Sequence, residues 1–412
     1  MTNQLFTFRV ALERLHLGPL GRYVDAFAEW LSEQGYSKCG LKYRMRLVAA
    51  LSRWMHQQGL DMCALDEKTA VTFLQFRRLD HCVDGNDRPT LRSLLEHLRQ
   101  SGVLPPAASE VDDSEMSRIV GNYAEYLTHE RRLTKVTLDN YLPTVRLFLE
   151  ERFGTRPLVL GEITPADIAR FVLRHARTLS RVRAKLLVTA LRSFFRFLHL
   201  RGEIRADLAA AVPTVANWRM ENVPKWIPTE QVEQLLKSCD QKRLTGQRNY
   251  AILLLLVRLG LRSGEVVGLA LDDIDWEAGE ITIRGKCRRS DRLPLPRDVG
   301  EALARYLRYG RPRCSTRHVF IRMKAPHRGF LRSSSVYSLV RRAFDHAGLK
   351  PVQRGPHILR HSLATSMLRK GASLGEIGQI LRHRKLTTTQ IYAKVDLESL
   401  RTIAPAWPGG EP

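Results

Sequence analysis

The chain has 412 residues, of which 44% are hydrophobic and 26% are charged. This length predicts two or three domains, and this composition excludes a collagen-like, low-complexity or largely disordered chain. Lys and Arg outnumber Asp and Glu by 66 to 42, and the resulting net charge of +24 favours a polyanionic partner, most commonly nucleic acid. A soluble protein that is basic without such a partner stays open as the alternative at this point.

The sequence predicts neither a membrane span nor export. Its longest purely apolar run, residues 251–257, is too short to cross a bilayer, and the N-terminus lacks a basic region followed by an apolar stretch. We find no basic amphipathic helix and no lipidation signal that would bind a membrane surface. The six cysteines form no C-x-x-C pair, so we expect no zinc ribbon, no disulfide framework and a reducing cytoplasm.

Positive charge increases along the chain. Residues 1–110 hold 14 Lys and Arg against 12 Asp and Glu, residues 111–220 hold 18 against 12, and residues 221–412 hold 34 against 18. The C-terminal part should therefore contact a polyanion most strongly and the middle part next. The nearly neutral N-terminal part favours a protein-interaction or spacer role over a second DNA-binding arm.

An internal repeat fills the first half of the chain. Three segments recur in the same order: residues 23–31 resemble 119–127, residues 65–68 resemble 163–166, and residues 91–98 match 191–198. Each copy predicts about four amphipathic helices, because apolar residues recur at three- and four-residue spacing. In the second copy we expect Thr164 to cap a helix that begins at Pro165. Linkers at 104–109 and 212–225 predict two small helical domains, 1–104 and 112–212, and a larger third domain, 222–412.

The third domain mixes helix and strand. An apolar helix is predicted over 247–258, and Ser263 is expected to cap the helix after it. Three short strands are predicted at 274–276, 280–284 and 292–295, followed mainly by helix from about residue 298. The fold class is therefore mainly α with a small antiparallel sheet (α+β).

Start signals in the last hundred residues predict three further helices. Pro356 opens a helix that ends near Lys370, and Ser373 with Glu376 forms a capping box for the next helix. A third start signal at 387–390 places Tyr392 within the first turns of its helix. His357 and Arg360 are three residues apart, so they share one helical face.

Several common chemistries find no support in the sequence. It contains no phosphate-binding G-x-x-x-x-G-K-[ST] loop, no G-x-G-x-x-G and no carboxylate cluster for magnesium. His357 and His361 have a spacing that zinc accepts, but no Glu or Cys accompanies them. We therefore expect no cofactor and no metal. Taken singly, a lone Tyr in a helix, a Lys beside a turn or an Arg after an apolar helix is most often structural or solvated.

Their combination is specific. In chain order it comprises Arg262 in Leu-Gly-Leu-Arg-Ser-Gly-Glu, Lys286 after Gly285, His357 and Arg360 in His-x-x-Arg, His383 and Tyr392. This set resembles the catalytic residues of the tyrosine recombinases, or phage-integrase family, in both order and intervals. The resemblance covers about residues 112–405, and the segment after Tyr392 looks like that of transposon-type mobile-element integrases. Two positions depart from the family pattern, because Arg382 and Cys287 stand where the family usually has glycine.

The resemblance implies two helical domains of the core-binding type, the second (SAM-like) one binding DNA, and a mixed α/β catalytic domain. It also implies a role for each residue of the set. Tyr392 would be the nucleophile that forms a 3′-phosphotyrosine, and Arg262 and Arg360 would clamp the phosphate. Lys286 would protonate the leaving 5′ oxygen, His357 would accept the tyrosine proton, and His383 would hydrogen-bond the phosphate.

The partners implied by the resemblance are double-stranded DNA and further recombinase subunits. The subunits would be four copies of this chain on two sites, or sister recombinases of the same element, acting in the bacterial cytoplasm at the nucleoid without a membrane or cofactor. Two other functions stay open: a metal-free type IB topoisomerase, and a non-catalytic DNA-binding protein of the same fold. The DNA site and the outcome, whether integration, excision, inversion or dimer resolution, are not determined by the sequence.

Overall fold

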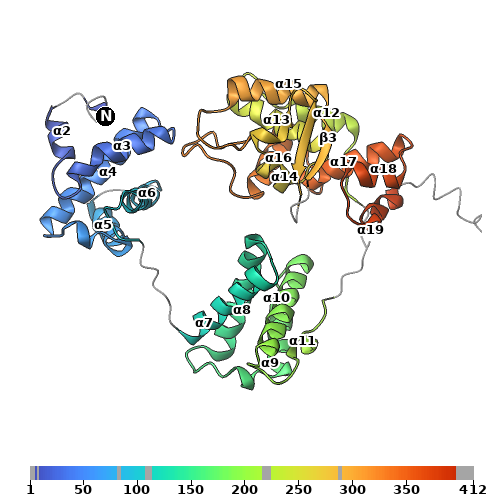
Figure 1. Cartoon of the computed structure of the whole chain (residues 1–412), viewed down its shortest axis with the longest axis horizontal. Helices are drawn as coiled ribbons and strands as arrows, with labels where there is room; N and C mark the ends of the chain where they lie inside the picture. The colour runs from blue at the N-terminus through green and yellow to red at the C-terminus, as the bar shows by residue number, and fades with distance from the viewer. Residues whose placement is uncertain are drawn as a thin grey trace, which may run out of the picture. The chain divides into compact units, whose positions relative to one another are not determined.

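The computed structural model describes residues 5–6, 9–80, 85–106, 114–215, 224–285 and 290–395. Within these ranges the chain is mainly α-helical with one small three-stranded antiparallel sheet, which confirms the predicted fold class (Figure 1). Contacts divide the chain into two compact units: one holds residues 108–221, and the other holds residues 1–107 and 222–412.

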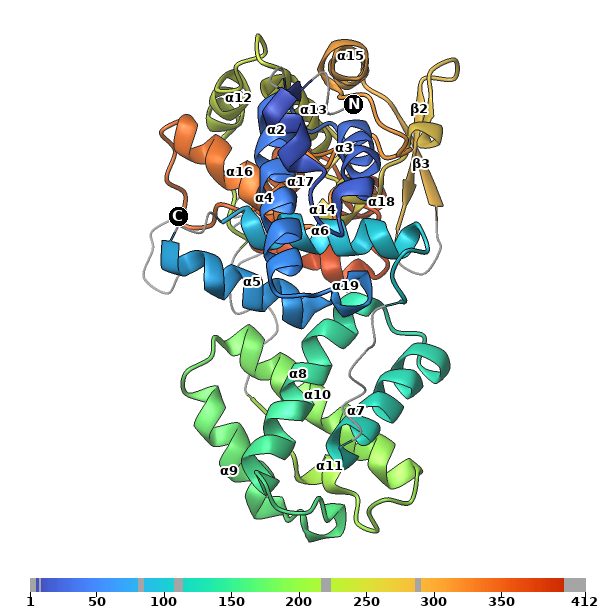
Figure 2. The same cartoon turned by 90° about the vertical axis from the view of Figure 1, so that its left-hand side faces the viewer.

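Residues 1–107 form a helical bundle with its own hydrophobic core. Its helices are α2 (Arg9–Leu15), α3 (Val24–Glu33), α4 (Lys38–Gln57), α5 (Glu67–Asp80) and α6 (Asp87–Gln100). Helices α3 and α4 lie against each other and α6 crosses both (Figure 2). Ser37 begins α4, because its hydroxyl accepts the backbone N–H of Gly40.

Residues 108–221 form a second helical bundle around a core rich in phenylalanine. Its elements are α7 (Glu115–Glu125), a π-helical turn η3 (Tyr126–Glu130), α8 (Lys135–Phe153), α9 (Pro165–Ala176), α10 (Arg181–Leu200) and α11 (Leu208–Ala211). Helices α8 and α10 pack along each other (Figure 1). The predicted start of α9 is confirmed: Thr164 and Asp167 form a capping box, with Pro165 as the first helical residue.

The order of helices is similar in the two bundles. Helices α3, α4, α5 and α6 correspond in order to α7, α8, α9 and α10, and a short 3₁₀ turn precedes both α5 and α9. An aromatic cluster recurs at equivalent positions. Phe27, Trp30 and His97 pack together in the first bundle, and Tyr123, Tyr126 and Phe197 pack together in the second.

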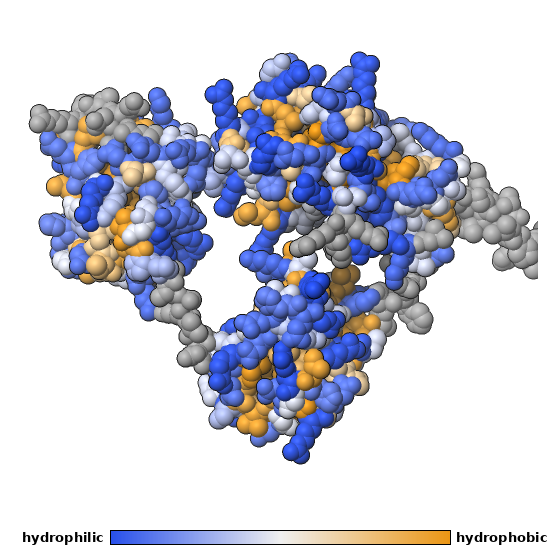
Figure 3. Space-filling view, viewed as in Figure 1, coloured by the Kyte–Doolittle hydropathy of each residue, from blue (hydrophilic) through white to orange (hydrophobic). Residues whose placement is uncertain are grey.

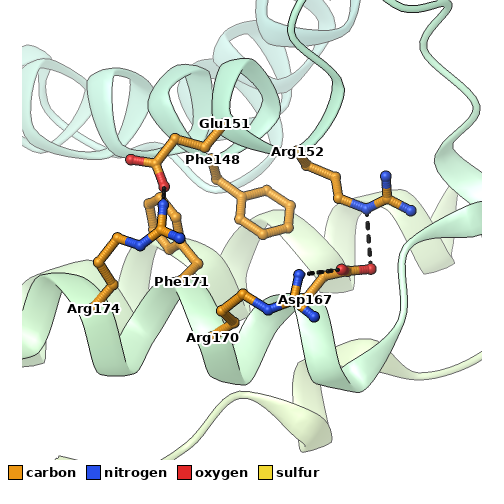
Figure 4. A pocket seen from close by; sticks show the side chains of 7 residues that line it. All are labelled: Phe148, Glu151, Arg152, Asp167, Arg170, Phe171 and Arg174. Atoms are coloured by element: carbon orange, nitrogen blue, oxygen red, sulfur yellow. Dashed lines mark hydrogen bonds and ion pairs between the residues drawn. The ribbon is translucent and has the colours of Figure 1, made fainter.

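A shallow pocket of about 80 Å³ lies between α8 and α9 of the second bundle (Figure 4). Asp167 is 3.0 Å from the Arg152 Nε and 3.5 Å from an Nη of Arg170, and Glu151 pairs with Arg174 at 3.2 Å. Every charged side chain that lines this pocket therefore already has a partner of opposite sign. Ion pairs among the lining residues connect α8 and α9 here. The pocket therefore offers no unpaired cation to a ligand.

The C-terminal residues pack around one buried helix. The helices here are α12 (Thr229–Lys237), α13 (Leu244–Arg258), α14 (Ser263–Gly268), α15 (Arg297–Arg305), α16 (Ser334–His346), α17 (Pro356–Arg369), α18 (Leu374–Ile380) and α19 (Leu386–Thr389). Helix α13 contacts α12, α14, α15, α16 and α17, and its residues 251–257 are all buried. Continuous apolar residues without periodicity are what a helix surrounded by neighbours requires.

The sheet comprises β1 (Ile274–Asp275), β2 (Glu280–Arg284) and β3 (Ser290–Pro294) in that order. Ile274 pairs with Ile281, and β2 pairs with β3 from Glu280↔Pro294 to Arg284↔Ser290. The three predicted strands are therefore confirmed, with β3 beginning two residues earlier. The predicted cap Ser263 is wrong by one residue. The Glu265 carboxylate accepts the Arg262 backbone N–H at 2.8 Å, so Arg262 is the N-cap of α14.

No helix among the described residues is long and apolar enough to cross a membrane. On the face shown in Figure 3, hydrophilic residues cover much of the visible surface, with apolar residues exposed between them. Such scattered apolar residues are ordinary on a folded protein.

Candidate active site

The end of α13 brings Arg262 to the site. Gly260 has a φ of +57°, a conformation that L side chains rarely adopt, and it turns the chain out of the helix. A Cβ at Gly260 would lie 2.8 Å from a Leu381 methyl carbon and 3.1 Å from a Leu363 methyl carbon. A side chain at this position would therefore be strained and would displace the two leucine side chains, where the turn packs against α17 and the end of α18.

Arg360 lies on α17 and is only 4% exposed. Its Nη1 donates to the Gly260 carbonyl and its Nη2 donates to the Leu381 carbonyl. Burial, with the nearby Arg262 and Arg382 charges, lowers the pKa of this guanidinium to about 10, so it remains a cation at neutral pH. Two of its five N–H donors thus hold the backbone.

Glu265 connects two further arginines. Its Oε1 accepts from the Arg262 Nη1 at 2.7 Å, and its Oε2 accepts from the Arg382 Nη2 at 2.9 Å. Burial acts to raise the pKa of this carboxyl, but the Arg262 amide and the two guanidinium groups outweigh it and lower the pKa, so Glu265 is ionised. The trio keeps a net charge of +1, since two cations share one carboxylate.

Arg382 occupies the position before His383 with a φ of +54°. This conformation explains why the family pattern favours glycine there, and it is strained for arginine. The Arg382 side chain is only 6% exposed and is held by Glu265. Sequence reasoning identified Arg382 only as a departure, whereas the structure makes it part of the site.

Tyr392 lies in the short 3₁₀ segment η8 (Gln390–Val395) and is 1% exposed. Its ring belongs to a small apolar cluster with Ala364, Ile377 and Leu381. Its hydroxyl is 2.9 Å from the His361 Nδ1. Burial raises the pKa of Tyr392 to about 12, although the Arg360 and Arg262 charges act to lower it.

His383 stands beside Tyr392 with its ring nearly parallel to the phenol, at a centroid separation of 6.4 Å. The His383 Nδ1 is 2.8 Å from the hydroxyl of the fully buried Thr389. Burial and the Arg360 and Arg262 charges lower the pKa of His383 to about 4, so the ring is neutral at pH 7. The Thr389 contact fixes the plane of the imidazole.

The structure thus brings together five of the six residues predicted from the sequence: Arg262, His357, Arg360, His383 and Tyr392 interact electrostatically in one site. Lys286 lies between β2 and β3 in the sequence, outside the described residues. Sequence reasoning considered His361 only as a zinc ligand, yet His361 contacts the Tyr392 hydroxyl. The available signal was its place directly after Arg360, one helical turn from His357.

Two guanidinium groups beside a phenol suit chemistry on a phosphate diester. Guanidinium forks match the paired oxygens of phosphate, and cations around a phenol favour the phenolate nucleophile. Within the described ranges, no group of three or more His, Cys, Asp or Glu residues could hold a metal ion. The guanidinium groups of Arg262 and Arg360 are cations that could stabilise negative charge on a phosphate in this site.

The pKa values of His361 and His383 predict a loss of stability in mild acid. Both pKa values are lowered to about 4 in the folded chain, His361 mainly by burial, and an exposed imidazole titrates near 6.5. Below pH 6.5 the two imidazoles bind protons in the unfolded state but not in the folded state. The free energy of unfolding therefore falls as the pH drops from 6.5 towards 4. By pH 5 both rings should have lost part of this stability, by an amount that solvent screening reduces because neither side chain is fully buried.

Thermal unfolding at pH 7 and pH 5 measures this effect. A variant carrying His361→Asn and His383→Asn should lose less stability between the two pH values than the native chain. His346→Asn, at the exposed end of α16, is the matched control and should keep the native pH dependence. An equal pH dependence in all three proteins would contradict the assigned shifts.

Comparison with known proteins identifies the family. Residues 225–398 match the phage integrase family, and residues 120–202 match the N-terminal SAM-like domain of phage integrases. The chain is 45% identical over 400 residues to the integrase/recombinase y4rA of Sinorhizobium fredii, covering 97% of both chains. It is 33% identical over 311 residues to the tyrosine recombinase XerD of Mycobacterium tuberculosis, covering 70% of this chain and 96% of that protein.

Solved structures share the fold. The XerH site-specific recombinase bound to its difH substrate in a post-cleavage complex superposes with a TM-score of 0.52 at 22% identity, covering 75% of this chain and 93% of that chain. The Tn1549 transposon integrase in complex with a circular-intermediate DNA gives a TM-score of 0.51 at 18% identity, covering 68% and 99%. Together with the curated relatives, these matches agree with the geometry of the site. The chain belongs to the phage integrase family of tyrosine-type site-specific recombinases.

Proposed function

We propose that the chain cleaves and rejoins double-stranded DNA at specific sites through a 3′-phosphotyrosyl bond at Tyr392. The observation that carries this proposal is that the Arg360 and Arg262 charges act on the Tyr392 phenol and favour its deprotonated form. The net charge of +24, concentrated after residue 221, supports a DNA partner. The relatives named XerD and y4rA support the same activity.

Each site residue receives a role in this proposal. Arg262 and Arg360 hold the non-bridging oxygens of the scissile phosphate, and His383 donates a further hydrogen bond to it. Lys286 protonates the 5′ oxygen that leaves. His357 lines an open cavity of about 620 Å³ with Arg341 and Arg354, which suits contact with the DNA phosphate beside the reaction.

The biological setting is the second part of the proposal. We infer that the chain moves a mobile genetic element and acts at the nucleoid, as four subunits on two DNA sites or with sister recombinases. Support comes from the transposon integrase and XerH neighbours, whose structures contain DNA. Analytical centrifugation with DNA that carries two sites measures how many subunits bind. A complex with no more than one subunit on each two-site DNA would contradict the proposed assembly.

The domain division is also proposed. Residues 1–104, 112–212 and 222–412 would be three domains, the first being a duplicate of the SAM-like domain. Separate hydrophobic cores in residues 5–104, 120–212 and 227–359 support this division.

A covalent trap tests the activity. Purified protein is mixed with nicked duplexes drawn from the DNA that flanks its own gene, and a denaturing gel resolves the products. We expect a protein–DNA band that Tyr392→Phe abolishes completely, because phenylalanine has no nucleophilic oxygen. Native gels with the same DNA serve as the control for binding, which Tyr392→Phe should preserve. An unchanged band in Tyr392→Phe would exclude Tyr392 as the nucleophile.

The topoisomerase alternative is separated by a relaxation assay. A type IB topoisomerase relaxes supercoiled DNA without sequence choice, whereas a recombinase needs matched sites. We expect recombination between two cloned flanking sites and no relaxation of a plasmid that lacks them. Relaxation of both plasmids at equal rates would favour the topoisomerase.

A further inference from the structure

His361 and His357 lie one helical turn apart on α17 but face different surroundings. The His361 Nδ1 is 2.9 Å from the Tyr392 hydroxyl, and the two rings meet edge to face with centroids 5.6 Å apart. His357 is exposed and lines the open cavity that Tyr337 and Arg341 also line. The imidazole that contacts the nucleophile is therefore that of His361.

The packing of α17 and η8 holds this contact in place. The Tyr392 ring is enclosed by Ala364, Ile377 and Leu381, so its hydroxyl is the polar part that needs a partner. His361 directly follows Arg360, whose guanidinium donates to the Gly260 and Leu381 carbonyls and thereby fixes this turn of α17. His361 is thus fixed by the same helix that carries one of the phosphate-binding arginines.

The protonation states fit a donor phenol and an acceptor imidazole. The charged or titratable groups that face His361 are Tyr392, His357, Arg360 and His383. Burial, followed by His357 and Arg360, lowers the pKa of His361 to about 4, so the ring is neutral and its Nδ1 can accept. A phosphate diester bound to Arg360 would offset part of that positive potential and make His361 more basic when the substrate is in place.

We propose that His361, rather than His357, accepts the phenolic proton of Tyr392 as the tyrosine attacks the scissile phosphate. This inference rests on the proposed function and assigns one of its proton transfers. The bond between the Tyr392 oxygen and phosphorus forms while the bond from phosphorus to the 5′ oxygen breaks. The phenolic proton passes to the His361 Nδ1 and makes an imidazolium, and the leaving 5′ oxygen takes its proton from Lys286. In rejoining, the imidazolium returns the proton to the departing phenolate.

Paired substrates separate the acceptor from the acid. One nicked duplex has the ordinary 5′ oxygen at the scissile position, and the other has a bridging sulfur, which leaves as a thiolate and needs no acid. With the oxygen substrate we expect His361→Asn and Lys286→Ala to slow covalent-complex formation by about 100-fold or more. With the sulfur substrate, the rate of covalent-complex formation should be restored in Lys286→Ala and should stay low in His361→Asn, because His361 acts on the attacking oxygen.

The choice of asparagine distinguishes proton acceptance from positioning. In His361→Asn the new amide oxygen reaches about where the imidazole Nδ1 lies and can accept the same hydrogen bond, but it does not take up a proton near neutral pH. Melting temperatures and native-gel binding close to those of the native chain show that the variant is folded. His361→Ala, which loses the hydrogen bond as well, should be at least as slow as His361→Asn.

The pH profile gives an independent readout. The cleavage rate of the native chain should fall in acid, because a protonated His361 cannot accept. This acid limb should disappear in His361→Asn and persist in the matched variant His357→Asn. The inference would be overturned if His361→Asn cleaved at the native rate or faster, or if the bridging-sulfur substrate restored its cleavage rate. The proposed function would still stand on the loss of the complex in Tyr392→Phe.

Discussion

An Arg360→Lys variant should form the covalent complex at least about 100-fold more slowly than the native chain. The loss of one oriented donor to a reacting oxyanion typically lowers a rate by about 10²–10³-fold. Here one guanidinium spans the Gly260 and Leu381 carbonyls, and in the proposed function the same group also holds the phosphate. A lysine ammonium is a single point charge, so it cannot bridge two carbonyls and hold two phosphate oxygens.

The burial of Arg360 adds to this effect. The side chain is 4% exposed, and a buried lysine loses its proton more readily than arginine. Gly260 lies two residues before Arg262, and Leu381 lies two residues before His383. The loops that carry Arg262 and His383 would therefore also lose the contact with Arg360 that they share.

Single-turnover cleavage of the nicked duplex, with protein in excess, measures the expected loss. Native gels run in parallel should show a much smaller change in DNA affinity, because Arg360→Lys keeps a basic residue and the net charge of +24 comes from many other side chains. Arg369→Lys is the matched control: Arg369 ends the same helix, is exposed and lies over the Trp226 ring at 4.1 Å. Arg360→Lys with more than a tenth of the native rate would contradict the role of the guanidinium fork.

Local signals explain which elements the sequence predicts well. The predicted N-cap at Thr164 and the predicted capping box at Ser373 and Glu376 each depend on residues within one helical turn, and the structure confirms both. The repeat could be recognised for a similar reason, because core positions such as Phe27 and Tyr123 recur at a nearly constant offset. Such patterns do not depend on how distant segments meet.

The contacts within the site depend on distant segments and could not be predicted. The Arg360 guanidinium meets carbonyls 100 residues before it and 21 residues after it. Glu265 joins Arg262 to Arg382, which is 117 residues away. The sequence identifies Arg382 only as an exception to a glycine pattern, because its positive φ and its carboxylate partner are features of the folded chain.

The same limit applies to the two histidines of α17. His357 and His361 both lie close to Arg360 along the helix, and both are imidazoles. What separates them is that η8 packs Tyr392 against one and not the other. Motif spacing therefore locates the site, and tertiary packing decides which residue touches the nucleophile.

The second large effect concerns the repeated bundles. Tyr123→Ala and Phe27→Ala remove equivalent aromatic rings, each with no exposed surface. In the second bundle the lost ring packs on Tyr126, Phe194 and Phe197. Each substitution should destabilise its own bundle by about 3–5 kcal/mol, the usual effect of deleting a core aromatic side chain.

Hydrogen exchange of the full chain shows where stability is lost. If the two copies are separate domains, Tyr123→Ala should increase amide exchange across residues 114–215 and leave 9–80 and 85–106 at native rates. Phe27→Ala should do the reverse. The matched control is Val182→Ala on α10, where the side chain is 80% exposed and its loss should change neither region.

This outcome would follow from the separate cores, since a cavity destabilises the cooperative unit that contains it and not a neighbour joined by a linker. Increased exchange in both copies from either single substitution would show instead that the repeats fold as one unit. The N-terminal copy could then not be a spacer that folds on its own, because its stability would depend on the bundle that matches the SAM-like domain.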